Sequence, residues 1–228
     1  MKRLFRPAIV LLTAAMLLCL TACGKTQDSQ AATADEAAAA DKAVEESDNV
    51  NGMRFNMTLL QFSQEYNKKK ATDDTASMMD IRKWQVNGKP ETDENGVQVQ
   101  YWYYDAGDVS FTATVEVQSD KLMNVGCGTT MRYFMGMTDN QNNSDAVLDE
   151  AAQMAAAVCG LPKDKTSTLR DIFYHTTVDS DDTFWYQGFV FSLSKKTGDE
   201  DNNNNMMLFR VFPVTDELRD EWKLREFS

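Results

Sequence analysis

Apolar residues recur at helical spacing in the stretch that begins at Thr58. Thr58 and Gln61 have the spacing of a capping box, in which each side chain hydrogen-bonds the backbone amide of the other. Basic residues from Lys68 to Lys70 suit the negative end of a helix dipole. The pattern therefore predicts a helix over 58–69. Its apolar stripe comprises Leu59, Phe62 and Tyr66.

A second apolar stripe lies further along the chain, where alanine is abundant. Asn143 or Ser144 can cap the start of a helix there, and Gly160 before Pro162 supplies a left-handed stop. We therefore predict a helix over 144–159 that packs closely on a sheet. Its apolar stripe comprises Val147, Ala151, Met154 and Val158.

Elsewhere the period of the pattern is two. Apolar and polar residues alternate in 97–104 and again in 109–118, and the turn sequence Asp105-Ala106-Gly107-Asp108 joins the two segments. Such alternation is typical of strands with one buried face. The strands predicted in this way are 77–86, 97–104, 109–118, 121–130, 169–177, 183–194 and 206–214.

These elements predict an α+β domain over 52–228, in which a helix and four strands are followed by a helix and three strands. We expect two helix-plus-antiparallel-sheet units, with halves at 52–138 and 139–228, and a short helix within 215–227. This element order resembles the tandem helix-plus-sheet modules of several bacterial lipoproteins and secreted inhibitors, such as the β-lactamase inhibitory protein-like fold. The resemblance implies a fold and carries no activity with it.

The first 22 residues have the layout of an export signal. Lys2, Arg3 and Arg6 precede an apolar run over 8–20, and no acidic residue occurs before Cys23. The run is too short to cross a hydrocarbon core, which needs about 20 residues. We therefore predict that residues 1–22 are a cleaved signal peptide.

Leu20-Thr21-Ala22-Cys23 closes this signal. The four residues resemble the lipobox of bacterial lipoproteins, and the resemblance implies that Cys23 is diacylated on sulfur and becomes the new N-terminus. Two acyl chains hold a protein stably on a membrane, where one binds only marginally. Because Gly24 gives no aspartate-type retention signal, we expect a lipid anchor on the outer face of the cell membrane, at a Gram-positive type of surface.

Residues 23–51 predict a lipidated, flexible tether. Apart from Val44 and Val50 the segment has no large aliphatic residue and no aromatic one, so it cannot bury enough surface to fold. In an alternative interpretation, the Ala- and Glu-rich stretch 31–46 forms helix and makes the spacer shorter and stiffer.

The chain is acidic. It carries 23 Lys and Arg against 35 Asp and Glu, a net charge of −12, and loss of Lys2, Arg3 and Arg6 with the signal makes the charge three units more negative. Such a surface repels phosphate backbones, which excludes nucleic acid as a partner class. We predict no cofactor and no metal site, because His175 is the only histidine and the acidic loops lack the glycine of an EF-hand.

Cys127 and Cys159 are the two cysteines left beyond the signal and the lipid site. They either form a disulfide in an oxidising exterior or stay apart as small buried apolar residues. The sharpest enzymatic alternative makes Cys127 the nucleophile and His175 the base of a small hydrolase of envelope polymer, in an order that resembles papain-like cell-wall endopeptidases. Those enzymes place the cysteine at a helix start, whereas Cys127 lies in a predicted strand.

Aromatic residues occupy consecutive positions in the strand 97–104, namely Tyr101, Trp102, Tyr103 and Tyr104. Because neighbours in a strand point to opposite faces, two of them point away from the face that a helix covers. That second face is either covered by another part of the domain or presented to a protein, peptide or glycan ligand. The best contact candidates are Trp102, Tyr104 and Trp185.

The sequence thus predicts a surface-tethered, non-enzymatic binding or interaction module of the bacterial envelope. The membrane is its first partner, through the lipid on Cys23, and a protein, peptide or glycan is its second. Two alternatives stay open. One is the Cys127/His175 hydrolase, and the other is an accessory subunit of an envelope complex.

Overall fold

The computed structural model describes residues 42–70, 78–130, 144–177, 182–196 and 206–227. Every described residue belongs to one compact unit, Ala31–Ser228. The predicted signal peptide, Cys23 and most of the predicted tether lie outside the described residues, so these remain predictions.

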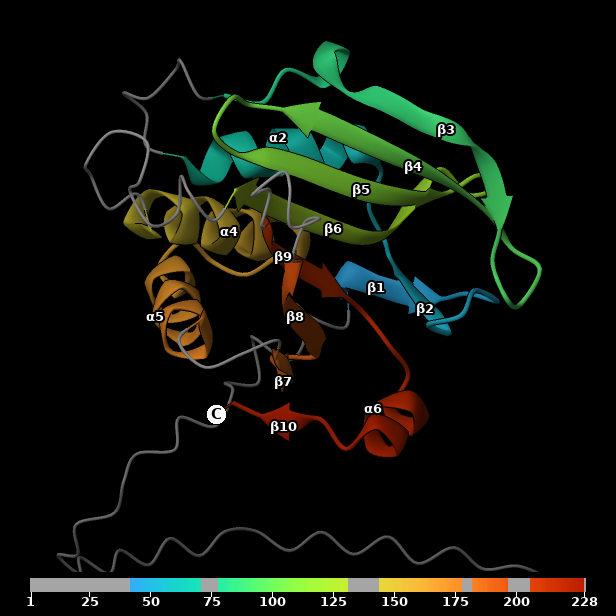
Figure 1. Cartoon of the computed structure of the whole chain (residues 1–228). Helices are drawn as coiled ribbons and strands as arrows, with labels where there is room; N and C mark the ends of the chain where they lie inside the picture. Colours follow the sequence, from blue (N-terminus) through green and yellow to red (C-terminus); the bar gives the residue numbers. More distant parts are fainter. Residues whose placement is uncertain (1–41, 71–77, 131–143, 178–181, 197–205, 228) are drawn as a thin grey trace, which may run out of the picture. The chain divides into compact units, whose positions relative to one another are not determined.

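An eight-stranded sheet forms the centre of the fold (Figure 1). Its strands run in the order β10-β7-β8-β9-β6-β5-β4-β3, and neighbours are antiparallel except for the parallel pair β10 and β7. The strands are β3 (Gln85–Thr92), β4 (Gln98–Asp105), β5 (Ser110–Glu116), β6 (Lys121–Thr130), β7 (Asp182–Tyr186), β8 (Phe189–Lys196), β9 (Met206–Phe212) and β10 (Arg225–Glu226).

The α+β class is confirmed, but the predicted composition of two helix-plus-antiparallel-sheet units within the domain is wrong. β6 pairs with β9, with Val125 opposite Val211, and this pairing joins the strands of the two predicted halves. An unpaired β6 edge would leave a row of backbone donors and acceptors open, and β9 pairs with this edge from Val125 to Thr130. The halves 52–138 and 139–228 therefore share one sheet and one main core.

The predicted strands 97–104 and 109–118 are present as β4 and β5. β4 and β5 pair along their whole length, with Tyr101 opposite Thr114. The predicted strand over 77–86 differs, because a short 3₁₀ helix, η2 (Ile81–Lys83), precedes β3. Asp80 caps η2, since its side chain accepts a hydrogen bond from the backbone N–H of Arg82 at 3.1 Å.

Helix α2 (Leu59–Lys69) confirms the first predicted helix and its capping box. Thr58 Oγ1 accepts a hydrogen bond from the N–H of Gln61 at 3.3 Å, and Gln61 Oε1 accepts one from the N–H of Thr58 at 2.8 Å. The helix therefore begins where the sequence places the cap. Its buried face comprises Leu59, Phe62, Ser63 and Tyr66.

Helix α4 (Ser144–Val158) confirms the second predicted helix. Gly160, at φ 67°, follows its end, and the N–H of Leu161 returns to the carbonyl of Ala156 at 3.0 Å. The alanine-rich helix packs against α2 and β6. Figure 1 shows α2 and α4 grouped beside the sheet, with α5 next to α4.

The segment 169–177 was predicted as a strand and is instead part of helix α5 (Lys165–Thr177). Leu169, Phe173 and Thr176 are buried at spacings of four and three, which is the helical period. Aromatic and β-branched residues favour a strand locally, but α5 packs along α4, and Phe173 contacts three aromatic rings of the sheet. Tertiary packing overrides the local propensity here.

The segment 183–194 was predicted as one strand and is instead the hairpin of β7 and β8. Its turn contains Gln187 at φ 52° and Gly188 at φ 87°, the two left-handed residues of a type I′ turn. The hairpin brings the rings of Phe184 and Phe191 together, with centroids 5.4 Å apart. One continuous strand could not make this contact.

The C-terminal segment contains the predicted short helix. Helix α6 (Asp216–Trp222) begins at Thr215, whose Oγ1 accepts a hydrogen bond from the N–H of Leu218 at 3.3 Å. Lys223, at φ 51°, ends the helix. Leu218 packs against a small second core formed by Trp185, Val190 and Val214.

Part of the predicted tether is folded. β1 (Val44–Glu46) and β2 (Met53–Phe55) form an antiparallel hairpin, so residues 44–51 belong to the domain and not to a flexible spacer. Phe55 gives the physical reason, because its side chain is fully buried and its ring centroid lies 5.8 Å from that of Phe189. This core residue draws the preceding strand onto the fold.

Replacing Thr58 by alanine removes the capping oxygen of α2, and the free energy of unfolding should fall by about 1 kcal/mol. Thr58→Ser keeps a hydroxyl at this position and should lose clearly less. Urea denaturation followed by far-UV circular dichroism measures both variants. Equal losses in the two variants would contradict the capping role of the hydroxyl.

Candidate functional site

The hairpin of β1 and β2 occupies a place that the large sheet leaves open. β9 pairs with β6 only from Val125 onward, and the hairpin lies beside the first half of β6. Leu122 donates its backbone N–H to the carbonyl of Met57 at 3.0 Å, and Thr215 donates its N–H to the carbonyl of Asn51 at 3.3 Å. The hairpin is thus tied to the sheet on one side and to the start of α6 on the other.

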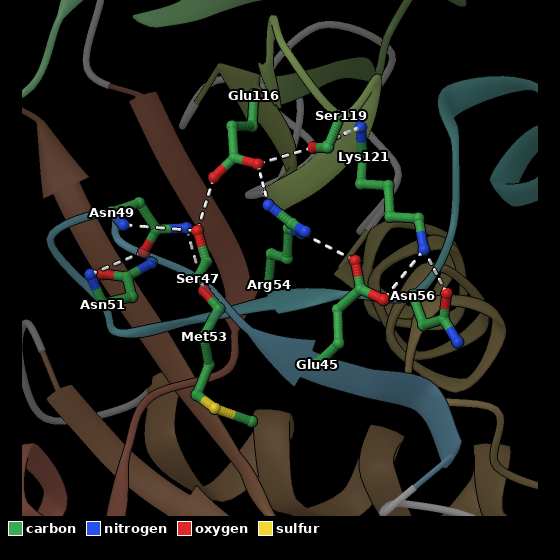
Figure 2. A network of polar contacts seen from close by, with 10 residues as sticks. All are labelled: Glu45, Ser47, Asn49, Asn51, Met53, Arg54, Asn56, Glu116, Ser119 and Lys121. Atoms are coloured by element: carbon green, nitrogen blue, oxygen red, sulfur yellow. Dashed lines mark hydrogen bonds and ion pairs between the residues drawn. The ribbon is translucent and has the colours of Figure 1, made fainter. Parts of the chain in front are cut away.

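Figure 2 shows the polar network that joins this hairpin to the turn between β5 and β6. At its centre is the carboxylate of Glu116, whose side chain is only 4% exposed. Ser47 Oγ donates to it at 2.5 Å, Ser119 Oγ donates at 2.6 Å, and the guanidinium of Arg54 donates as well. Both carboxylate oxygens are therefore hydrogen-bonded, as burial requires.

The same guanidinium continues the network toward solvent. Arg54 Nε donates to Glu45 Oε1 at 2.7 Å, and Lys121 Nζ donates to Glu45 Oε2 at 3.0 Å. Lys121 Nζ also donates to the side-chain oxygen of Asn56. Carboxylates and cations alternate along this chain of contacts, so the charges of the network balance.

The network lowers the pKa of both carboxyl groups. Burial by itself raises the pKa of Glu116, but hydrogen bonds from two serine hydroxyls and the charge of Arg54 outweigh it, and the pKa lies below its ordinary value. Burial also opposes ionisation of Glu45, whose pKa is lowered by its contacts with Arg54 and Lys121. Both groups are therefore ionised at neutral pH and already paired.

Asn49, which is 1% exposed, fixes the hairpin turn. Its Nδ2 donates to the carbonyl of Met53 at 3.1 Å, and its Oδ1 accepts from the N–H of Asn51 at 2.9 Å. Gly52 follows at φ 69°, and a Cβ at this position would lie 2.5 Å from Cγ2 of Thr215. Both the left-handed backbone and the close approach favour glycine.

A cleft of about 760 Å³ opens between the hairpin, the β7–β8 turn and the start of α6. We refer to this space as the acidic cleft. Its apolar lining includes Val44, Met53, Trp185, Pro213 and Val214. Its acidic lining comprises Glu46, Asp48, Asp216 and Glu217.

The negative charge of the acidic cleft is only partly balanced. Within the described part of the chain, three of its carboxylates make no ion pair, namely Glu46, Asp48 and Glu217. Asp216 pairs with Arg219 at 3.1 Å, and the basic lining residue Arg54 is already held in the network. The acidic cleft therefore keeps an excess of negative charge that a bound cation could balance.

Trp185, one of the predicted contact residues, lies where the acidic cleft meets a smaller cleft. The residue is 9% exposed and packs with Val190 and Val214. The guanidinium of Arg219 lies over its ring at 5.3 Å from the centroid, which is a cation–π contact. The ring thus already accepts one cation and also lines the acidic cleft.

The other two predicted contact residues do not join Trp185 in an exposed patch. Tyr104 is buried among aromatic rings, and Trp102 is partly buried against the same core. The outward side chains of β4 are Tyr101 and Tyr103, which are 38% and 36% exposed. The alternation of the strand predicted two faces, but it did not indicate which of them faces the core.

The thiol-hydrolase alternative finds no support at Cys127. The side chain is fully buried in β6, and this burial, together with the nearby charge of Glu150, raises the pKa of its thiol well above the ordinary value. A buried, protonated thiol is a poor nucleophile. His175 lies exposed on α5 instead, and the alternative of a disulfide is wrong, because Cys127 and Cys159 are both free.

Comparisons with known proteins return no relative. No protein-family model, no curated protein and no solved structure matches the chain. Among the described residues, no group of three or more His, Cys, Asp and Glu side chains could hold a metal ion. No helix in the same part of the chain is long and apolar enough to cross a membrane. Function must therefore be argued from the acidic cleft and its surroundings.

The sequence contains a turn signal for the hairpin of β1 and β2, although the composition of 23–51 predicts a flexible tether. Asn51-Gly52 is a strong turn dipeptide with an apolar strand residue on either side, Val44 and Phe55. No local signal links Arg54 to Glu116, which lies 62 positions further along the chain. The turn was therefore predictable, whereas the network and the cleft were not.

Glu116→Gln keeps the shape of the side chain and removes its charge, so the free energy of unfolding at neutral pH should fall by about 1–3 kcal/mol. Because the folded state lowers the pKa of Glu116, its contribution is present above the ordinary value of 4.5 and is lost as the pH falls through the folded-state pKa. The stability gap between wild type and variant should therefore close at acidic pH. Urea denaturation across a pH series measures it.

The control for this series is Glu91→Gln, which removes an exposed carboxylate from the edge strand β3. It should show almost no stability gap at any pH. A gap for Glu116→Gln that persists unchanged into strongly acidic solution would rule out the ionised carboxylate as its cause.

Proposed function

We propose that this protein is a lipid-anchored, non-enzymatic binding module of the bacterial envelope, and that its acidic cleft holds a basic segment of a partner protein or peptide. The observation that carries the proposal is the unbalanced charge beside Trp185. Glu46, Asp48 and Glu217 line a cleft and make no ion pair with any described residue. A segment that supplies Lys or Arg side chains would balance them.

The mixture of apolar and acidic lining suits a lysine or arginine side chain. Its aliphatic stem can pack against Met53 and Val214 while its charged end reaches the carboxylates. Trp185 adds an aromatic edge of the kind that favours cations. The net charge, −12 for the full chain and more negative without the signal, also steers a basic partner toward the protein and makes the association sensitive to salt.

The chemistry of the acidic cleft supports binding without turnover. General acid–base catalysis needs a group whose pKa lies near the working pH. The carboxyl groups of Glu45 and Glu116, next to the cleft, have lowered pKa values and are committed to ion pairs. A role as accessory subunit of an envelope complex agrees with the same geometry, since the basic segment can belong to another subunit.

The lipid on Cys23 would decide where this binding takes place. The hairpin of β1 and β2 is the first described strand pair after Cys23, and it forms one wall of the acidic cleft. A partner on the same membrane surface would meet the cleft at a raised effective concentration. The anchor therefore favours a membrane-associated partner.

Cys23→Ser removes the sulfur that takes the lipid, and the protein should leave the membrane fraction for the soluble one. Cell fractionation followed by detergent phase partition measures the distribution. Cys159→Ser changes a buried thiol and should leave the protein with the membranes. If Cys23→Ser fractionates like wild type, the lipid anchor is refuted.

The acidic cleft is tested by isothermal titration calorimetry with a short oligolysine peptide. Wild type should bind the peptide, and added salt should weaken the binding. The triple variant Glu46→Gln/Asp48→Asn/Glu217→Gln should bind at least about tenfold more weakly, because the charges that face the peptide are gone. Oligoglutamate of the same length should not bind.

A matched control is Glu91→Gln/Asp164→Asn/Asp171→Asn. It changes the net charge by the same amount at exposed positions outside the acidic cleft. This variant should bind oligolysine nearly as well as wild type does. Equal weakening in both triple variants would mean that only the overall charge matters and would refute the cleft as the site.

A further inference from the structure

A second cavity, of about 410 Å³, lies between α2, α4 and the hairpin of β4 and β5. It shares no lining residue with the acidic cleft. Its apolar walls include Tyr66, Tyr104, Val109 and Phe111. We call it the Lys70 cavity, after the buried lysine in its lining.

Lys70 follows the last residue of α2 and turns its side chain inward. Its backbone is extended, at φ −64° and ψ 155°, so the helix stops there. The side chain is 3% exposed, and Nζ donates to Glu150 Oε1 at 2.6 Å. Nζ also lies 5.3 Å from the ring centroid of Tyr66. A buried ammonium group thus lines the cavity between a carboxylate of α4 and a ring of α2.

Tyr66, Lys70 and Glu150 differ in how many of their hydrogen-bond donors and acceptors are paired. Tyr66 donates its hydroxyl to Glu150 Oε2, so both carboxylate oxygens are occupied. Burial, and then the charge and hydrogen bond of Glu150, raise the pKa of Tyr66 well above its usual range, so the hydroxyl keeps its proton. Lys70 has three N–H donors and uses one of them in contacts with described residues. The other two N–H groups meet no acceptor among the described residues, so a ligand in the cavity can accept from them.

Stability alone does not account for this ion pair. Apolar residues of similar size often replace a buried ion pair with no loss of stability, because the pair must be desolvated. The core around the pair is rich in apolar and aromatic side chains that could extend over its place. Lys70 is 3% exposed and Glu150 is 22% exposed, so the lysine is buried while the carboxylate borders the open cavity. A buried polar group in the wall of a cavity can orient a bound ligand.

The polar lining of the Lys70 cavity selects the kind of ligand. Lys70 and Lys83 donate hydrogen bonds, whereas Glu150, Asp105 and Asp108 accept them. A carboxylate can only accept and would meet three carboxylates, and an ammonium group can only donate and would meet two lysines. A hydroxyl group both donates and accepts, so a neutral polyhydroxyl ligand can accept from the lysines and donate to Asp105 and Asp108.

We propose that the Lys70 cavity binds a neutral pyranose ring, either as a free sugar or as the terminal residue of a glycan. The volume falls in the range of small-ligand sites. Lys70 hydrogen-bonds one hydroxyl inside, the exposed Asp105 and Asp108 accept hydroxyls at the mouth, and Tyr104 supplies an apolar wall. This site does not depend on the acidic cleft, and either one can fail without the other.

A ligand-observed NMR titration tests the proposal on the full chain, held in a detergent without a sugar headgroup. The probes are the methyl β-glycosides of glucose, galactose and N-acetylglucosamine, with glucuronic acid and glucosamine as charged analogues. At least one neutral glycoside should bind, and at least about tenfold more tightly than the charged analogues. No binding of any neutral glycoside, or equal binding of a charged analogue, would overturn the proposal.

The corresponding disaccharides distinguish the two sources of the ring. Tighter binding of a disaccharide than of its monosaccharide supports a glycan end as ligand, and equal binding supports a free sugar. Both results agree with a pyranose site. Oligolysine binding at the acidic cleft is measured separately, so its loss does not bear on this titration.

Lys70→Met/Glu150→Leu removes both charges together and should still unfold cooperatively, at a Tm close to that of wild type. Its binding of the neutral glycoside should fall at least about tenfold. The matched control, Glu65→Leu/Lys68→Met, removes an exposed ion pair from the same helix and should bind like wild type.

A second variant, Asp105→Asn/Asp108→Asn, changes the exposed mouth of the cavity and leaves the buried pair in place. It should fold like wild type and bind the glycoside several-fold more weakly, which keeps the test decisive if the buried variant fails to fold. Unchanged binding in a folded variant of either kind would overturn the assignment of the sugar to this cavity.

Discussion

The carboxylate of Glu116 lies at the end of β5, almost out of contact with water, and the position of the N-terminal hairpin depends on it. A charge in that place needs partners, and Ser47 and Arg54 supply them from the hairpin while Ser119 supplies one from the adjacent turn. The hairpin lies beside β6 and forms a wall of the acidic cleft. The ion pair of Glu116 and Arg54 thus helps to position the hairpin that forms one wall of the acidic cleft.

Sequence reasoning succeeded where the signal is local. Thr58 and Thr215 act as caps within three residues of their own position, and Gly160 ends α4 by its own conformation. It failed where the outcome depends on distant partners. Phe173 lies in a helix because it packs against α4 and the sheet, and β9 belongs to the first sheet because β6 has an open edge. The packing partners of Phe173 and the pairing of β9 with β6 lie far away in the sequence, so local patterns cannot predict them.

The candidate site was less predictable than the fold for a related reason. Glu46 and Glu217 come from opposite ends of the described chain, and only the hairpin and α6 bring them to one cleft. Trp185 lines the acidic cleft and Tyr104 lines the Lys70 cavity, whereas Trp102 is partly buried against the main core. Alternation along a strand predicts that neighbouring side chains point to opposite faces of the sheet. It does not predict which face is buried, because that depends on which face the helices cover.

The free thiols of Cys127 and Cys159 have a consequence for how the domain matures. Both are buried without pairing, and burial raises the pKa of each, which keeps them in the unreactive thiol form. The fold therefore needs no oxidant, no disulfide catalyst and no reshuffling step to reach its native contacts. Such a domain can acquire the same structure whatever the redox potential of the compartment in which it folds.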